Sequence, residues 1–302
     1  MAGAKSKIPL LIVFMMSWYS YSFSQDRTET HPGSVVYESV ELESEILGKI
    51  VRYNIYLPKD YHTSTMKYPV LYLLHGYSDD ETGWTQFGQV KRIADDLIDA
   101  HEAAQMVIVM PDAGVTWYVN CADEAEKYED FFIRELMPHI EQEYKVRKGR
   151  QFSGVAGLSM GGYGALMLSL RHPDLFSSAG VLSAGVFTDD EILDMEQAQW
   201  DRLLGLPFGK GLSGQDRLAG NYQKYSPEKL IAAYKEKQGN VRFYIDCGDD
   251  DFLILGNMNL HAMMIQEKVS HEFRVRDGGH TWGYWRSGLR SVLPFISEVF
   301  HR

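Results

Sequence analysis

The stretch "GVAGLSMGGYGAL", Gly154 to Leu166, decides the fold, because an apolar segment runs through a G-x-S-x-G pattern into a helix of small residues. Ser159 stands between the expected strand and the expected helix, which is the setting that a nucleophile elbow requires. Gly157 and Gly161 flank the serine, since side chains beside so tight a turn would clash. The pattern is short and occurs in unrelated chains, so the surrounding sequence has to support it.

The segments around this stretch alternate between strands and helices. Unbroken apolar runs follow one another from residue 68 onward: "YPVLYLL", "MVIVMP", "QFSGVAG", "FSSAGVLS", "VRFYID" and "HEFRVRD". The segments between them, such as "VKRIADDLIDAHEA" and "SPEKLIAAYKEK", carry apolar residues at helical spacing. This alternation is typical of a mostly parallel sheet with helices on both faces. We therefore expect an α/β fold.

Two further features define the expected domain. "SVVYESVELES" and "GKIVRYNIYLP", with "ILGK" as the turn, predict an N-terminal antiparallel hairpin. The sequence contains no internal repeat and no low-complexity tract, so we expect residues 35–302 to form one domain. Residues 187–224 interrupt the alternation, and so long a connection is usually functional. Its apolar side chains either line a substrate cleft or plug the insertion onto the core: Trp200, Leu203, Leu206 and Phe208.

The amino terminus has the layout of a secretory signal peptide. Two lysines precede the apolar run "IPLLIVFMMSW", and Ser22 and Ser24 are spaced for cleavage before Gln25. The alternative is a membrane anchor, but the run is about half of the ~20 residues that a spanning helix needs. We expect residues 1–24 to be removed, the protein to be secreted or periplasmic, and no stable membrane insertion to follow.

Charge and cysteine content narrow the partners and the redox chemistry. The formal net charge of -11 opposes binding to nucleic-acid backbones and anionic lipid, so no nucleic-acid partner is expected. Two cysteines cannot form the disulfide framework of a small secreted domain. Cys121 and Cys247 fall on separated parts of the expected sheet, and a bridge needs Cα atoms within roughly 7 Å. Free buried thiols are therefore favoured over a single bridge.

A reactive serine needs a histidine base, and the base needs a carboxylate, in the chain order serine, acid, histidine. His280 follows the last expected strand in "RDGGHTW", where two glycines free the backbone to present the imidazole. The other histidines near the end of the chain fall in a helix, at a strand start or at the terminus: His261, His271 and His301. We therefore predict His280 as the base.

The loop after the preceding strand, "YIDCGDDDFL", offers the acid. Its candidates are Asp246, Asp249, Asp250 and Asp251. Consecutive carboxylates repel one another, so most must be solvated; Asp251, directly before an apolar helix start, is best placed to be held rigidly. A calcium loop is the competing interpretation, but the D-x-D-x-D-G spacing is absent.

Negative charge that develops on a substrate oxygen needs backbone donors. The amide after the nucleophile, that of Met160, is one candidate, and the loop after the first central strand supplies the other. His75 and Gly76 end that strand, which makes the Tyr77 amide the second candidate. His75 is either a second base or, as is more usual for a histidine at a strand end, a hydrogen-bonded structural residue.

With these residues in place, the sequence resembles the α/β-hydrolase superfamily. More narrowly it resembles the putative esterase family, which includes feruloyl and acetyl xylan esterases, S-formylglutathione hydrolase (esterase D) and the antigen 85 mycolyltransferases. The matching segments cover most of residues 68–286: "YPVLYLLHG", "GW" at 83–84, "VMPDAG", "WY" at 117–118, "YEDFFIRELMPHIE", "GLSMGGYGAL", "CGDDDFL" and "GGHTWGYWR".

The resemblance implies an α/β-hydrolase fold and assigns the site residues. The family's acid loop maps onto residues 248–251 and selects Asp251, while its serine and histidine map onto Ser159 and His280. Its oxyanion donors map onto Tyr77 and Met160. The implied chemistry is acyl transfer through an acyl-serine, with no metal or organic cofactor.

The resemblance also suggests a substrate class. An exported member with "GGHTWGYWR" is most similar to bacterial esterases that remove feruloyl (hydroxycinnamoyl) or acetyl groups from plant cell-wall xylan. Aromatic side chains that either contact such a substrate or belong to the core are Trp84, Trp117, Tyr118, Trp200, Phe208 and Trp282. The alternatives are a short-chain esterase or thioesterase similar to S-formylglutathione hydrolase, an acyltransferase, and a non-catalytic binding protein.

Overall fold

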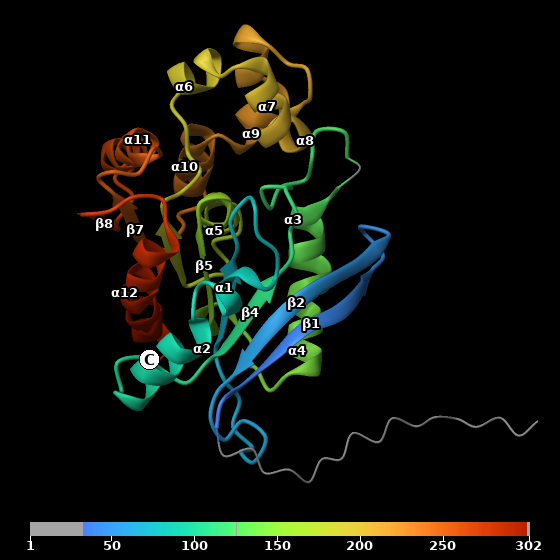
Figure 1. The fold of residues 1–302 in the computed structure, drawn as a ribbon, viewed down its shortest axis with the longest axis vertical. Coiled ribbons are helices and arrows are strands. Elements are labelled where there is room, and N and C mark those ends of the chain that lie inside the picture. The colour runs from blue at the N-terminus through green and yellow to red at the C-terminus, as the bar shows by residue number, and fades with distance from the viewer. Residues whose placement is uncertain (1–32, 125, 301–302) are drawn as a thin grey trace, which may run out of the picture. The chain divides into compact units, whose positions relative to one another are not determined.

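A computed structural model describes residues 33–124 and 126–300. Its centre is an eight-stranded sheet in the order β1-β2-β4-β3-β5-β6-β7-β8 (Figure 1). The strands are β1 (Val35–Ser44), β2 (Lys49–Leu57), β3 (Val70–Leu74), β4 (Val107–Pro111), β5 (Ser153–Leu158), β6 (Ser178–Leu182), β7 (Arg242–Gly248) and β8 (His271–Arg276). The strands from β4 to β8 in this order run parallel, whereas β1 pairs antiparallel with β2, and β2 with β4. The predicted fold class, with its N-terminal hairpin, is confirmed.

The central strands are apolar throughout because both faces of the sheet are covered. In β3, Tyr72 and Leu74 contribute to one core cluster and Leu71 and Leu73 to the other. The second cluster lies under α2 (Val90–Asp99) and α12 (Trp282–Phe300), which pack against each other. The first lies under α3 (Tyr128–Phe131), the π-helical turn 132–136, α4 (Met137–Glu143), α5 (Met160–Arg171), α10 (Pro227–Glu236) and α11 (Ile254–Gln266). Successive side chains of one strand therefore serve opposite layers.

Residues 187–224 fold into short helices rather than an irregular loop. They are α6 (Asp189–Asp194), α7 (Gln197–Leu203), α8 (Gly205–Phe208), a 3₁₀ turn at 214–218 and α9 (Gly220–Tyr225), which lie together in Figure 1. Trp200 is fully buried, and its indole N–H donates to the Gly209 carbonyl at 2.9 Å. Arg217 lies over the same ring. Trp200 therefore packs the insertion, and the prediction that it contacts substrate is wrong.

The sequence also predicts the state of the two cysteines, the absence of stable membrane insertion and a signal peptide at the amino terminus. Cys121 and Cys247 are both buried and free, as the favoured interpretation expected. Among residues 33–124 and 126–300, no helix is both long and apolar enough to span a bilayer. The predicted signal peptide, 1–24, lies outside the described residues.

Candidate active site

Ser159 occupies the sharp turn between β5 and α5. Its φ of 55° and ψ of −118° are unfavourable for a residue with a side chain, and such strain is concentrated at functional turns. The neighbouring glycines make the turn feasible. A Cβ on Gly157 would lie 2.3 Å from the Gly161 carbonyl oxygen, and one on Gly161 would lie 2.5 Å from that of Leu74. Only glycine fits at both positions, as the sequence predicted.

The structure brings the three predicted side chains into one chain of hydrogen bonds. The Ser159 hydroxyl lies 3.0 Å from His280 Nε2. On the other side of the ring, Nδ1 lies 2.9 and 3.0 Å from the two carboxylate oxygens of Asp251. Because a carboxylate only accepts, Nδ1 donates to Asp251, and Nε2 is left free to accept the serine proton. This arrangement suits the removal of a proton from Ser159.

Asp251 is held rigidly and kept charged. Its side chain is fully buried, and the Leu253 amide donates to Oδ1 at 2.9 Å. Burial by itself raises the pKa of Asp251, but hydrogen bonds from His280, Leu253 and Ser183 outweigh this effect, so the pKa lies below its ordinary value. The carboxylate is therefore ionised at neutral pH.

The other aspartates of this region have different surroundings. Asp246 is buried, but it accepts hydrogen bonds from Arg276 Nε and from the Tyr244 hydroxyl, both at 2.9 Å, and from the Tyr284 hydroxyl. Asp249 and Asp250 are exposed. The geometry thus singles out Asp251 as the partner of His280.

Sequence reasoning missed Ser183, which lies directly after β6. This residue is fully buried with a φ of 42°, and its hydroxyl accepts a hydrogen bond from Trp285 Nε1 at 3.1 Å. It also hydrogen-bonds to the Asp251 carboxylate and lowers its pKa. Trp285 in turn meets the His280 ring edge to face, with centroids 4.8 Å apart. The sequence did contain a signal for this role, because Ser183 follows the carboxyl end of β6, the strand next to β5.

We predict that Ser183→Ala will lower kcat/KM by about 10-fold, since a hydrogen bond to a charged group contributes about 1.5–3 kcal/mol. The pKa of Asp251 will rise, because its charged form loses a donor. With one donor fewer, the carboxylate will attract the positively charged imidazolium of His280 more strongly, so the acid limb of the kcat/KM profile, where the histidine base is lost, will move to higher pH. Alanine keeps the Cβ, so the backbone at this φ is no more strained than before.

The matched control for this variant is Ser178→Ala, a buried serine at the opposite end of β6. It should leave the pH profile in place. An unmoved acid limb in Ser183→Ala would contradict the link between this hydroxyl and Asp251, whatever the fall in rate.

The loop after β3, which carries the predicted donor Tyr77, lies beside the nucleophile. A Cβ built on Gly76 would lie 3.7 Å from the Ser159 Cβ. His75 is buried: Nδ1 lies 2.7 Å from the Gly76 carbonyl oxygen, and Nε2 accepts from the Ala113 amide at 2.9 Å. His75 is thus a structural residue that shapes the loop, and not a second base. Met160, the other predicted donor, is the first residue of α5, where backbone amides have no partner within the helix.

The predicted aromatic contacts with substrate are mostly wrong. Trp84 and Tyr118 are fully buried; the Trp84 indole donates to the Leu74 carbonyl and the Tyr118 hydroxyl to that of His75, at 2.9 and 3.0 Å. Buried aromatic rings with one polar atom usually satisfy it in this way. Both residues therefore brace the loop after β3.

Three of the predicted aromatic residues lie nearer the site. Trp117 and Phe208 are buried, and they line a cavity of about 10 Å³ together with Gly185, whose amide donates to the Ser159 carbonyl at 2.9 Å. Trp282 is partly exposed and packs against Trp84. Trp117 and Phe208 are only 4% and 3% exposed, so Trp282 has the most accessible ring of the six predicted aromatic residues.

Comparisons with known proteins identify the family of this chain. A family model described as "Putative esterase" matches residues 44–296. A solved structure titled "ferulic acid esterase" is 34% identical, with a TM-score of 0.73, and the match covers 89% of this chain and 99% of that one.

Two curated relatives point to the same family. "Endo-1,4-beta-xylanase/feruloyl esterase" of Xylanibacter ruminicola is 32% identical over 182 residues, 58% of this chain and 25% of the relative. "Acetyl esterase" of Caldicellulosiruptor saccharolyticus is 23% identical over 243 residues, 80% of this chain and 87% of the relative. The chain thus spans a quarter of the first relative and most of the second. It belongs to the putative esterase family, and its Ser–His–Asp arrangement is that of a serine carboxylic-ester hydrolase.

Proposed function

We propose that this protein is a secreted serine esterase that removes feruloyl or acetyl groups from plant cell-wall polysaccharide such as xylan. The observation that carries the proposal is the continuous contact from the Ser159 hydroxyl through the His280 ring to the buried Asp251 carboxylate. The names of the relatives, a ferulic acid esterase and an acetyl esterase among them, support the acyl groups.

The first half of the reaction forms an acyl-enzyme. His280 Nε2 takes the hydroxyl proton as Ser159 Oγ attacks the ester carbonyl, and Asp251 stabilises the resulting imidazolium through Nδ1. The carbonyl oxygen becomes negatively charged between the amides of Tyr77 and Met160. When the tetrahedral intermediate collapses, the C–O bond to the alcohol breaks, and His280 gives its proton to the departing oxygen.

The second half returns the enzyme to its starting state. His280 takes a proton from a water molecule, whose oxygen attacks the acyl carbon. Collapse of the second tetrahedral intermediate breaks the bond to Ser159 Oγ, which recovers its proton from His280. The products are one carboxylic acid and one alcohol, and one water molecule is consumed.

A panel of esters tests the proposed function. We expect the purified protein to hydrolyse p-nitrophenyl acetate and methyl ferulate, and to release ferulate or acetate from esterified xylan. Turnover of feruloyl or acetyl sugar esters above that of S-formylglutathione will favour the polysaccharide over the thioester. Absence of ester hydrolysis, together with absence of labelling by a fluorophosphonate, would instead identify a binding protein on this fold.

A further inference from the structure

Phe252 places an exposed aromatic ring directly against His280. Its side chain is 67% exposed, and the two ring centroids are 4.6 Å apart. The residue follows Asp251 in the chain, and the residue after it, Leu253, is buried. The turn that carries Asp251 therefore points its carboxylate inward and this phenyl ring outward.

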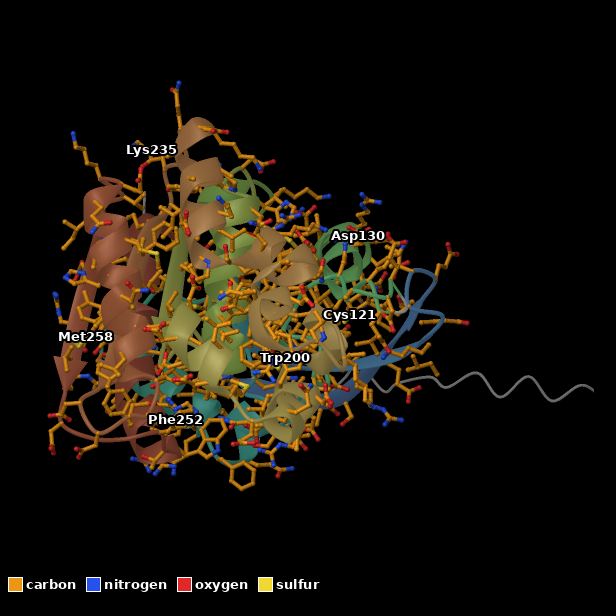
Figure 2. The ribbon with its side chains drawn as sticks, turned by 90° about the horizontal axis from the view of Figure 1, so that it is seen from above. Cys121, Asp130, Trp200, Lys235, Phe252 and Met258 are labelled. Atoms are coloured by element: carbon orange, nitrogen blue, oxygen red, sulfur yellow. The ribbon has the colours of Figure 1, made fainter. Side chains whose placement is uncertain are left out.

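The turn fixes the backbone that carries the ring. The Asp251 amide donates to the Gly248 carbonyl at 3.3 Å, and the Ile254 amide donates to the Asp251 carbonyl at 3.0 Å. These bonds tie the residues on both sides of Phe252 to β7 and to the start of α11. Phe252 lies two residues before the start of α11, and Met258 lies within that helix; both are labelled in Figure 2. Single exposed apolar residues are common on protein surfaces, so the exposure of Phe252 does not by itself indicate a function. The feature that does is its contact with the His280 ring.

The reaction requires the alcohol portion of the ester to lie beside His280. The imidazolium must reach the departing oxygen within hydrogen-bond distance in order to protonate it. Trp285 is buried and covers one side of the imidazole edge to face, whereas Phe252 is exposed. Phe252 therefore offers an exposed ring, in contact with His280, to the group attached to the departing oxygen.

We propose that Phe252 is the specificity-determining residue for the alcohol portion of the substrate, and that it receives a sugar ring. A sugar ring presents an apolar C–H face that packs on an aromatic side chain, while its edge is polar. The proposal rests on the proposed esterase function and adds the side from which the polysaccharide approaches.

The experiment compares two feruloyl esters with different alcohols, methyl ferulate and feruloyl-arabinofuranose. Phe252→Ala should lower kcat/KM about 10-fold on the sugar ester and less than about 3-fold on the methyl ester, since loss of one packed aromatic contact corresponds to roughly 1–2 kcal/mol. Phe252→Trp should restore the preference for the sugar. The deacylation rate, measured on the feruloyl-enzyme, should not change, because the alcohol has already left.

Met258→Ala is the matched control, because Met258 is an exposed apolar residue of α11 away from His280. It should leave the activity on both esters unchanged. An equal fall on both esters in Phe252→Ala would overturn the inference, since Phe252 would then only support His280. If the wild-type protein hydrolyses neither ester, the proposed function fails and this inference with it, which is a separate and recognisable result.

Discussion

Replacement of Ser159 by alanine is expected to abolish ester hydrolysis, with kcat falling by roughly 10⁶-fold, as loss of a serine nucleophile does in other serine hydrolases. The hydroxyl oxygen is the atom that forms the acyl bond, and water cannot replace it at the same strained turn. The Cβ at φ 55° is kept, so the turn and the unfolding temperature should be preserved. Steady-state hydrolysis of methyl ferulate and thermal unfolding measure the two quantities.

The control for this variant is Ser169→Ala. Ser169 is buried on α5, the helix that Ser159 precedes, and its hydroxyl donates to the Ala165 carbonyl at 2.6 Å within the helix. It should retain activity and covalent labelling by a fluorophosphonate, whereas Ser159→Ala should lose both. Turnover within about 100-fold of the wild type in Ser159→Ala, too small a loss for a missing nucleophile, would assign the reaction to another group.

The strands and the position of Ser159 could be predicted because they depend on local patterns. Unbroken apolar runs identify the buried parallel strands, and alternation identifies the hairpin of β1 and β2. Since the carboxyl ends of parallel strands meet at one edge of the sheet, the residues after β5, β7 and β8 had to approach one another. Ser159, Asp251 and His280 therefore lie together, although 121 residues separate the first from the last.

The predicted roles of the aromatic residues depended on packing, which no local pattern reveals. Trp84 and Trp200 are large aromatic residues of the type that often contacts a substrate. Each is nevertheless fully buried, with its indole N–H paired to a carbonyl. Phe252 is an apolar residue of the type that usually lies in a core, yet it is exposed. Ser183 was missed for a related reason, because its link to Asp251 depends on how the ends of β6 and β7 are placed.

Replacement of Asp251 by asparagine is the second large effect, with an expected loss of about 10⁴-fold in kcat. An asparagine amide can donate to His280 Nδ1, which moves the ring proton to Nε2, and Nε2 can then no longer accept the proton of Ser159. The wild-type carboxylate avoids this because its pKa lies below the ordinary value, so it stays an acceptor down to acidic pH. Kinetics on p-nitrophenyl acetate from pH 5 to 9 measure the loss, which should persist throughout the neutral range.

Asp246→Asn is the matched control, since it makes the same change at a second buried aspartate. Asp246 lies within β7, whereas Asp251 lies in the turn that follows this strand. The Asp246 carboxylate accepts from Arg276, Tyr244 and Tyr284, so its loss should lower the Tm by leaving the Arg276 guanidinium without its partner. Below that Tm, kcat should stay far above that of Asp251→Asn, because Asp246 makes no contact that orients His280. The reverse pattern, with the large loss of kcat in Asp246→Asn and a nearly intact Asp251→Asn, would transfer the role of the acid to Asp246.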